Sequence, residues 1–282
     1  MGRITTIIGS GRTVGVIWVL LFVLALGWLL RPAPEPPVIP GWSNWKEVGA
    51  VFCLLPYRNG VLAAGANGIW YLDEQSAQRF TPEGPGADVI IHQLALDQDN
   101  GLWVGHSGGL SLLVAGSWTH IGPLDGIPEP PVYALALDEL GGWIGGEGGL
   151  MRFHGAPPWQ ESALTRIAPS AGIPVSRISA LMQDGSGGLW IGSNEPPRGG
   201  LFRKSGGAVS FWGSGSGLPH PQVTSLLQDG RGRVWAGTGF HNRGGAALLA
   251  ASGENWELVF EIDENTGVVD LVMDPRDPDV IY

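Results

Sequence analysis

The chain has 282 residues, enough for one large domain with appendages. Its formal net charge of −10 argues against a nucleic-acid partner, because a phosphate backbone is bound by clustered Lys and Arg. The single cysteine, Cys53, excludes an intramolecular disulfide, and its place in a strand pattern predicts a buried thiol.

The first element is an apolar segment over residues 14–30, which contains no charge and no proline. As a helix it would be about 26 Å long, close to the ~30 Å hydrocarbon core of a membrane. Arg3 and Arg12 precede it, which favours a cytoplasmic N-terminus over residues 1–13. We expect an uncleaved signal anchor in the cell membrane, with a cleaved signal peptide as the alternative. In both cases the rest of the chain is extracytoplasmic.

A Pro-rich linker follows over residues 31–41, where five of the nine residues 32–40 are proline. Such a composition favours a stiff, extended spacer. The next segment, Trp42–Val48, resembles the segments that end the later repeats. We interpret it as an outermost strand that would close a ring of blades, because a free sheet edge invites unwanted pairing.

A hairpin pattern then recurs along the chain, and residues 225–237 show it clearly. Ser225–Gln228 predicts a half-buried strand and Asp229–Gly232 a tight turn. Val234–Ala236 predicts a second strand with a Trp in it, which Gly237 ends. The glycines that close this pattern in successive repeats are Gly65, Gly105, Gly145, Gly192 and Gly237.

The spacing of these glycines indicates the fold class. Steps of 40, 40, 47 and 45 residues are typical of blades of four short strands. We therefore predict an all-β protein, a β-propeller of four-stranded antiparallel blades over residues 42–282. Five repeats are complete, and the first half of a sixth begins near Val269. Because this half-repeat stops at Tyr282, we expect the printed chain to be part of a longer propeller.

Two residue types recur inside the hairpins. The second strands carry Trp103, Trp143, Trp190 and Trp235. Burying one indole removes roughly 150–250 Å² of surface, so these residues are better explained as blade cores than as a binding site. The turns begin with Asp97, Asp138, Asp184 and Asp229. We expect each aspartate to cap its own turn rather than to join a ring of acids.

The repeated Asp-x-x-Gly-x-Leu-Trp-Ile-Gly-x-x-x-Gly-Gly-Leu, followed by Gly-Leu/Ile-Pro, resembles the two-component regulator propeller repeat. The resemblance covers about residues 50–282 and is strongest at Asp184–Leu201 and Asp229–Gly245. That family is best known from the extracytoplasmic sensor regions of bacterial hybrid histidine kinases. The resemblance implies β-propeller blades and a sensing role.

Loops longer than in the other repeats predict where a ligand would bind. The fourth and fifth repeats carry insertions between the second and third strands, on the same face as the connections between blades. Loops that a rigid scaffold displays often carry function. The candidate ligand- or partner-binding residues are Glu195, Arg198, His220, His241, Asn242 and Arg243.

The predicted function is a membrane-anchored sensor or binding module for a small ligand or a protein, without catalysis, metal or other cofactor. One alternative is a lyase or hydrolase, because streptogramin-lyase-like propellers act with His and Glu near a metal. His220, His241 and Glu195 are the right residue types, but no tight ligand spacing links them. The other alternative is a structural assembly scaffold.

Overall fold

The computed structural model describes most of the chain from residue 47 onward. The described ranges are 47–73, 75–80, 89–168, 172–173, 177–194, 199–213, 215–239, 244–249, 255–262, 267–274, 277 and 280–281. The predicted cytoplasmic tail, signal anchor, Pro-rich linker and the Trp42–Lys46 part of the predicted closing strand lie outside them. Glu47 and Val48, the last two residues of that prediction, form a turn and not a strand. Among the described residues, no helix has the length and apolarity to cross a membrane.

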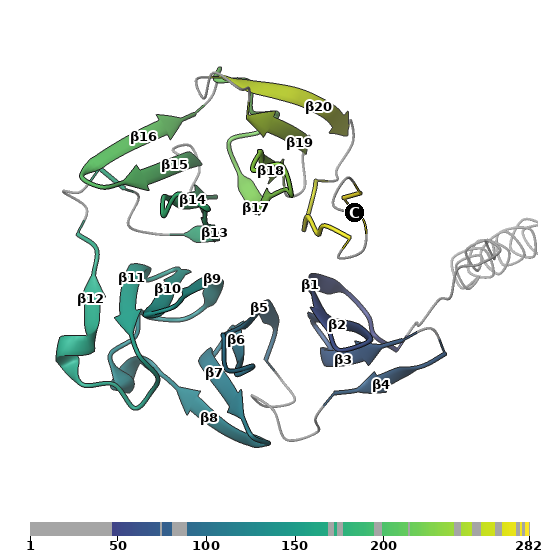
Figure 1. The fold of residues 1–282 in the computed structure, drawn as a ribbon, viewed down its shortest axis with the longest axis vertical. Coiled ribbons are helices and arrows are strands. Elements are labelled where there is room, and N and C mark those ends of the chain that lie inside the picture. Colours follow the sequence, from purple (N-terminus) through teal and green to yellow (C-terminus); the bar gives the residue numbers. More distant parts are fainter. Residues whose placement is uncertain are drawn as a thin grey trace, which may run out of the picture. The chain divides into compact units, whose positions relative to one another are not determined.

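The described residues form five antiparallel sheets of four strands, which confirms the predicted β-propeller (Figure 1). Two short 3-10 helices, η1 (Pro123–Asp125) and η2 (Glu161–Ala163), lie in the connections. In chain order the strands of the first two blades are β1 (Val51–Tyr57), β2 (Gly60–Gly65), β3 (Gly68–Leu72), β4 (Ala77–Arg79), β5 (Ile91–Leu96), β6 (Leu102–His106), β7 (Gly109–Val114) and β8 (Ser117–Ile121). The next two blades contain β9 (Val132–Asp138), β10 (Gly141–Gly146), β11 (Gly149–His154), β12 (Leu164–Arg166), β13 (Ile178–Gln183), β14 (Leu189–Ser193), β15 (Gly200–Ser205) and β16 (Ala208–Trp212). The fifth blade contains β17 (Val223–Gln228), β18 (Val234–Thr238), β19 (Gly244–Leu249) and β20 (Trp256–Ile262).

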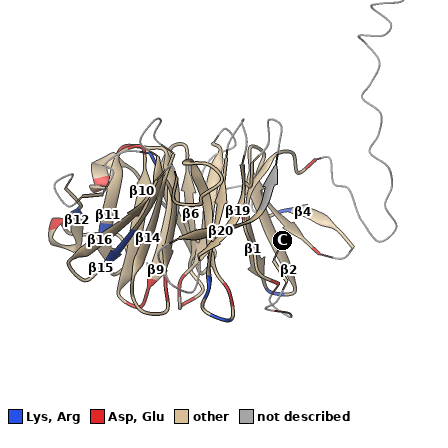
Figure 2. Cartoon of the chain, turned by 90° about the horizontal axis from the view of Figure 1, so that it is seen from above, with Lys and Arg blue, Asp and Glu red and all other residues tan. Residues whose placement is uncertain are grey.

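The first strand of each blade is innermost and the fourth is outermost (Figure 1). We call the end of the blades that bears the turns between first and second strands the hairpin end. The opposite end bears the turns between second and third strands and the connections to the next blade, and we call it the crossing end. Seen from the side, acidic residues lie mainly in turns at the strand ends, and the strands are mostly uncharged (Figure 2).

Neighbouring blades pack through a repeated contact between an aliphatic side chain and a glycine. The first residue of every innermost strand is a Val or Ile: Val51, Ile91, Val132, Ile178 and Val223. A Cβ added to Gly192 of the fourth blade would lie 2.8 Å from Cγ1 of Val223 in the fifth. In the second to fifth blades this close approach leaves no room for a Cβ, which explains the glycine near the end of their second strands.

The strand register corrects the predicted phase of the first repeat. Gly105 pairs with Gln93, two residues after the start of its innermost strand, whereas Gly65 pairs with Val51 at the start itself. The equivalent of Gly105 in the first blade is therefore Ala64, which pairs with Cys53. The prediction that Gly65 is the matching glycine is wrong, because the first blade places an alanine at that position.

The tryptophans of the second strands contribute to the core as predicted. Trp103 and Trp190 are 3% and 2% exposed, whereas Trp143 and Trp235 are partly buried. The ring of Trp190 stacks on Trp212 of its own blade at 5.3 Å and meets Trp256 of the next blade edge-on at 6.2 Å. The indoles thus join blades as well as fill them. Cys53 is also buried, at 3% exposure, as predicted.

The segment 267–274, where a sixth repeat was predicted, lies between the fifth and first blades. The Thr224 hydroxyl donates to the Val268 carbonyl, as the Ser179 hydroxyl donates to the Val223 carbonyl one blade earlier. Val268 therefore takes the place of the first residue of a sixth innermost strand. The Asp270 carboxylate then accepts from the Leu54 amide of β1 at 3.2 Å and from the Ser225 hydroxyl of β17 at 2.9 Å. Among the described residues, the strand pairing of segment 267–274 is one bridge, between Met273 and Ile281.

Candidate functional site

Of the six residues predicted to form a site, His220 is the one that the structure describes. It lies at the crossing end, in the connection between β16 and β17, and it is partly buried. Its Nδ1 accepts a hydrogen bond from the Gln222 amide at 3.1 Å, so one ring nitrogen stabilises the connection itself. Burial lowers the pKa of His220, which favours the neutral ring. Glu195, Arg198, His241, Asn242 and Arg243 lie outside the described residues.

The innermost strands share a feature that the sequence did not predict. In each of them the pairing skips the second residue, so that one extra residue bulges out of the ladder. A β-bulge re-aims the side chain it carries, and bulges are common beside active sites. We call these five residues, which lie near the centre of the crossing end, the bulge ring. They are Phe52, His92, Tyr133, Ser179 and Thr224.

The bulge ring is aromatic over the first three blades. The ring centroids of Phe52 and His92 are 6.4 Å apart. His92 and Tyr133 meet at 4.9 Å with their planes at 72°, which is an edge-to-face contact. Such contacts hold flat side chains in fixed orientations. This half of the ring is therefore a continuous aromatic surface built from three separate blades.

An ion pair extends the aromatic half of the bulge ring toward the fourth blade. The Tyr133 hydroxyl donates to Glu147 at 3.5 Å, and Nε of Arg177 donates to the same carboxylate at 3.1 Å. Burial, and then the charge of Glu147, raises the pKa of Tyr133, so the phenol stays protonated. The side chains of Arg177 and Glu147 are 49% and 40% exposed, so both remain accessible to a ligand.

The other half of the bulge ring carries hydroxyl groups, which face inward to structural partners. The Ser179 hydroxyl donates to the Val223 carbonyl at 2.5 Å, and the Thr224 hydroxyl makes the equivalent bond to Val268. These residues join each blade to the next one. The aromatic residues instead join neighbouring blades through ring contacts, so the five equivalent positions divide into a hydroxyl half and an aromatic half.

One polar atom in the aromatic half is left without a partner. Nε2 of His92 is buried and makes no hydrogen bond to any described residue. Burial lowers the pKa of His92 to about 4, so the imidazole is neutral near pH 7. A buried polar atom without a partner costs free energy of about 1–3 kcal/mol, so His92 is a site of local instability in the fold. Within the described residues, no group of three or more His, Cys, Asp or Glu is placed to hold a metal ion.

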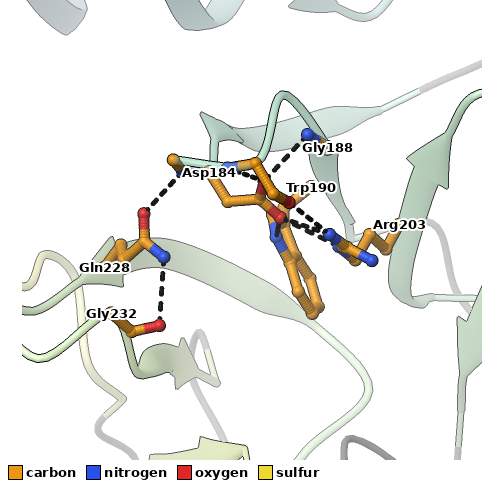
Figure 3. A network of polar contacts seen from close by, with 8 residues as sticks. Asp184, Gly188, Trp190, Arg203, Gln228 and Gly232 are labelled. Carbon is orange, nitrogen blue, oxygen red and sulfur yellow. Dashed lines mark hydrogen bonds and ion pairs between the residues drawn. The ribbon is translucent and has the colours of Figure 1, made fainter.

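The hairpin end is built on aspartates, as predicted, but each carboxylate does more than cap its turn (Figure 3). Asp184 accepts from the turn amide of Gly188 at 2.8 Å, from the Trp190 indole at 2.8 Å and from Nε of Arg203 at 2.9 Å. Burial alone would raise the pKa of Asp184, but hydrogen bonds from Ser186, Trp190, Gly188 and Arg203 outweigh it and hold the pKa far below its usual value.

The hydrogen bond that the Trp indole donates to the aspartate was not predicted from the sequence. Asp97 and Asp229 make the same bond, to Trp103 at 2.8 Å and to Trp235 at 2.9 Å. The constant spacing of six residues between Asp and Trp is the signal that could have revealed it. In the third blade the spacing is five, and Asp138 instead forms a bidentate pair with Arg152 at 2.7 and 2.9 Å.

Solved structures share this fold at low sequence identity. The extracellular domain of a hybrid two-component system from B. thetaiotaomicron is 17% identical, with a TM-score of 0.66 over 86% of this chain and 33% of that one. PorZ, a surface component of the type-IX secretion system of Porphyromonas gingivalis, is 16% identical, with a TM-score of 0.56 over 80% of this chain and 38% of that one. The structure of YCF48 bound to D1 peptide is 16% identical, with a TM-score of 0.55 over 87% of this chain and 79% of that one. This chain spans about a third of the length of the first of these structures.

Comparison with sequences gives a family for two of the repeats. A search of curated proteins finds no significant match. The model of the two-component regulator propeller, however, matches residues 172–195 and 217–240. Both segments overlap the ranges where the resemblance was predicted to be strongest. The two matched segments lie in the fourth and fifth blades of this β-propeller, which are therefore similar to two-component regulator propeller repeats.

Proposed function

We propose that this chain is an extracytoplasmic sensor or recognition module that binds a small ligand or a protein partner at the crossing end, without catalysis. The bulge ring carries this proposal. The residue before each bulge is a Val or Ile in all five blades, whereas the bulged residue is Phe, His, Tyr, Ser or Thr. Packing therefore constrains the first position and leaves the chemistry of the second to differ from blade to blade.

The aromatic half supports a binding role more directly. Phe52, His92 and Tyr133 offer aromatic side chains, and Glu147 with Arg177 offers both charges. Sites for small ligands combine aromatic surface with a few polar groups in this way. The long loops that contain Glu195, Arg198, His241, Asn242 and Arg243 belong to the same end and would add contacts.

The family and the neighbours agree with this proposal without deciding it. The two matched repeats are similar to those of a family of regulators, and one neighbour is the extracellular domain of a two-component system. The structure of YCF48 with D1 peptide indicates that a propeller of this kind accommodates a peptide in that protein. We further propose that residues 14–30 anchor the chain in the cell membrane. Alkaline extraction of membranes would test the anchor, since an anchored chain stays in the pellet and a chain without residues 14–30 does not.

The lyase alternative gains no comparable support. It requires His220, His241 and Glu195 to act together, and the one described member, His220, already uses Nδ1 to hold Gln222. The scaffold alternative does not account for a buried His92 nitrogen without a partner.

A ligand screen on two variants tests the proposal. The full chain in detergent is screened by thermal shift against small molecules and peptides, and each hit is retested on His92→Ala with Tyr133→Phe. The matched control is Gln183→Ala, which removes a buried amide oxygen that also lacks a partner but belongs to the hairpin end. If the ligand binds at the bulge ring, its affinity should fall at least tenfold in the double variant and should not change in the control. Equal affinities in all three proteins would reject the site.

A further inference from the structure

A cavity lies away from the bulge ring, at the outer side of the second and third blades. Its volume is about 570 Å³, within the range of ligand sites. The second blade contributes Thr119, His120 and Ile121 of β8 and the turn of η1, and the third blade contributes Trp159, the η2 turn and β12. We call it the rim cavity.

The rim cavity runs along an open sheet edge. Among the described strands, β8 pairs only with β7, so its outer backbone groups face the cavity side without a strand partner. An exposed edge of this kind accepts a further strand, and added peptides commonly bind in this way. The edge residues at the cavity, Thr119 to Ile121, are long enough to pair with a short extended segment.

A buried hydrogen-bond chain orients His120 at this edge. The Gly108 amide donates to Nδ1 of His106 at 3.1 Å, so that nitrogen carries no proton. Burial, and then the charges of His120 and His92, lowers the pKa of His106 to about 4, so the neutral ring carries its proton on Nε2. His106 therefore donates from Nε2 to the Ser111 hydroxyl at 2.9 Å.

The Ser111 hydroxyl must then donate its own proton onward, to Nδ1 of His120 at 3.3 Å. His106 is fully buried and Ser111 is 1% exposed, so water does not compete with this order. This hydrogen-bond chain holds the ring of His120 on the face of β8 that carries Ser111, whereas Thr119 and Ile121 lie on the other face of the strand, toward the third blade and the rim cavity.

The remaining lining combines apolar and acidic groups. Trp159 is held by ring contacts to Trp103 at 6.0 Å and Phe153 at 4.9 Å, and its indole donates to the Gly155 carbonyl at 3.1 Å. Leu124 lines the cavity and is fully exposed, at 103%. Exposing a large apolar side chain to water does not stabilise the fold, and such residues often mark interaction sites. These two side chains offer an apolar contact on either blade.

The charges of the lining favour a basic ligand. Asp125 and Glu161 contribute two negative charges, and Arg166 contributes one positive charge but already donates to the Gly148 carbonyl at 3.1 Å. The chain as a whole carries −10, which also attracts a cation. Asp125 likewise accepts from the Gly122 amide at 2.8 Å, so Asp125 and Arg166 each already bind a backbone group, and the lining keeps an excess of negative charge for the ligand.

We propose that the rim cavity binds an extended, basic peptide segment of a partner protein, which pairs with the outer edge of β8. An apolar side chain of the peptide packs on Trp159 and Leu124, and a Lys or Arg faces Asp125 and Glu161. This partner site is separate from the bulge ring, so neither proposal depends on the other.

The test uses the acetylated and amidated pentapeptide Lys-Val-Leu-Val-Lys as a probe on the full chain in detergent, measured by isothermal titration calorimetry. One control peptide has Glu in place of each Lys, and the other is methylated at alternate backbone nitrogens. We expect the acidic peptide and the methylated peptide each to bind about tenfold more weakly, because one loses charge attraction and the other loses edge pairing. A neutral trisaccharide, maltotriose, tests the other class of ligand.

Matched variants locate the binding. Leu124→Ser and Glu161→Gln change exposed cavity residues, and the controls Leu140→Ser and Glu139→Gln change exposed residues of the β9–β10 turn. Both cavity variants should weaken the probe about three- to tenfold and both controls should not. Ser111→Ala changes a side chain on the other face of the second blade and should leave the affinity for the probe unchanged.

Three results would overturn the proposal. The first is no binding of the probe up to 1 mM, and the second is binding of maltotriose in its place. The third is equal affinity of the probe for the cavity variants and the controls, which would place the peptide elsewhere. A loss of affinity confined to the cavity variants and to the methylated and acidic peptides would support it.

Discussion

The two ends of the blades follow opposite rules. At the hairpin end, Asp97, Asp184 and Asp229 accept the same set of bonds from their turns and from an indole. At the crossing end, the bulge has the same geometry in all five blades but a different side chain in each. A feature that repeats in both geometry and chemistry serves the fold. A feature that repeats in geometry alone leaves its chemistry free for binding.

The largest expected effect comes from the hairpin end. Asp184→Asn removes the charge that Arg203 and the Trp190 indole share, and breaking such a buried pair costs about 3–5 kcal/mol of unfolding free energy. Because Arg203 is 30% exposed, we expect the low end, about 3 kcal/mol. Urea unfolding followed by circular dichroism measures this, and Asp99→Asn at an exposed turn position is the control.

The same variant has a pH signature. The folded-state pKa of Asp184 is depressed, so its contribution is complete above the unfolded pKa near 3.9 and is lost as the pH falls below it. The difference between wild type and Asp184→Asn should therefore shrink below about pH 4. A difference that stays constant down to pH 2 would contradict the assigned network.

The second effect arises from the buried histidines of the second blade. Burial lowers the pKa of both His92 and His106 to about 4, so each is neutral in the fold. Stability is then complete above the unfolded pKa near 6.5 and falls as the pH drops toward 4, by at most about 3 kcal/mol for each ring. His106→Asn should flatten this slope, as measured by urea midpoints from pH 7 to pH 4. An unchanged slope would mean that His106 is not neutral in the fold.

Much of the fold follows from the sequence, because its causes are local. Asp-Gly turns, β-branched strands and a period near 45 residues specify blades without reference to the rest of the chain. The phase of the first repeat was mistaken because Ala64 replaces the glycine there, and only the pairing with Cys53 reveals it. A sequence motif marks the hairpin but not the register of its partner strand.

The site was harder to predict for a physical reason. A bulge is one extra residue opposite a partner strand, and the spacing of residues within a single strand does not show it. Phe52, His92 and Tyr133 come together from three blades that are 40 and 41 residues apart in the chain. The long loops of the fourth and fifth repeats were visible as insertions, and they remain a prediction.

The third effect concerns the junction of the fifth and first blades. Asp270→Ala would leave the Leu54 amide and the Ser225 hydroxyl without an acceptor. We expect a loss of about 2 kcal/mol, since two donors are left partly buried and unpaired. The neighbouring Val269→Ala, at a side chain that is 49% exposed, is the control. If both variants unfold at the wild-type urea midpoint, residues 267–274 do not join the two blades in solution.

The smallest expected effect separates the two ends most sharply. His92→Phe removes the ring nitrogen that lacks a partner and keeps a flat ring between Phe52 and Tyr133. Its unfolding free energy should stay within about 1 kcal/mol of wild type or rise, because no described hydrogen bond is lost. At the hairpin end no polar side chain of the aspartate networks tolerates such a change. A loss of more than about 2 kcal/mol would show that His92 serves the fold, and the division between a repeated structural end and a variable binding end would then fail at its most informative residue.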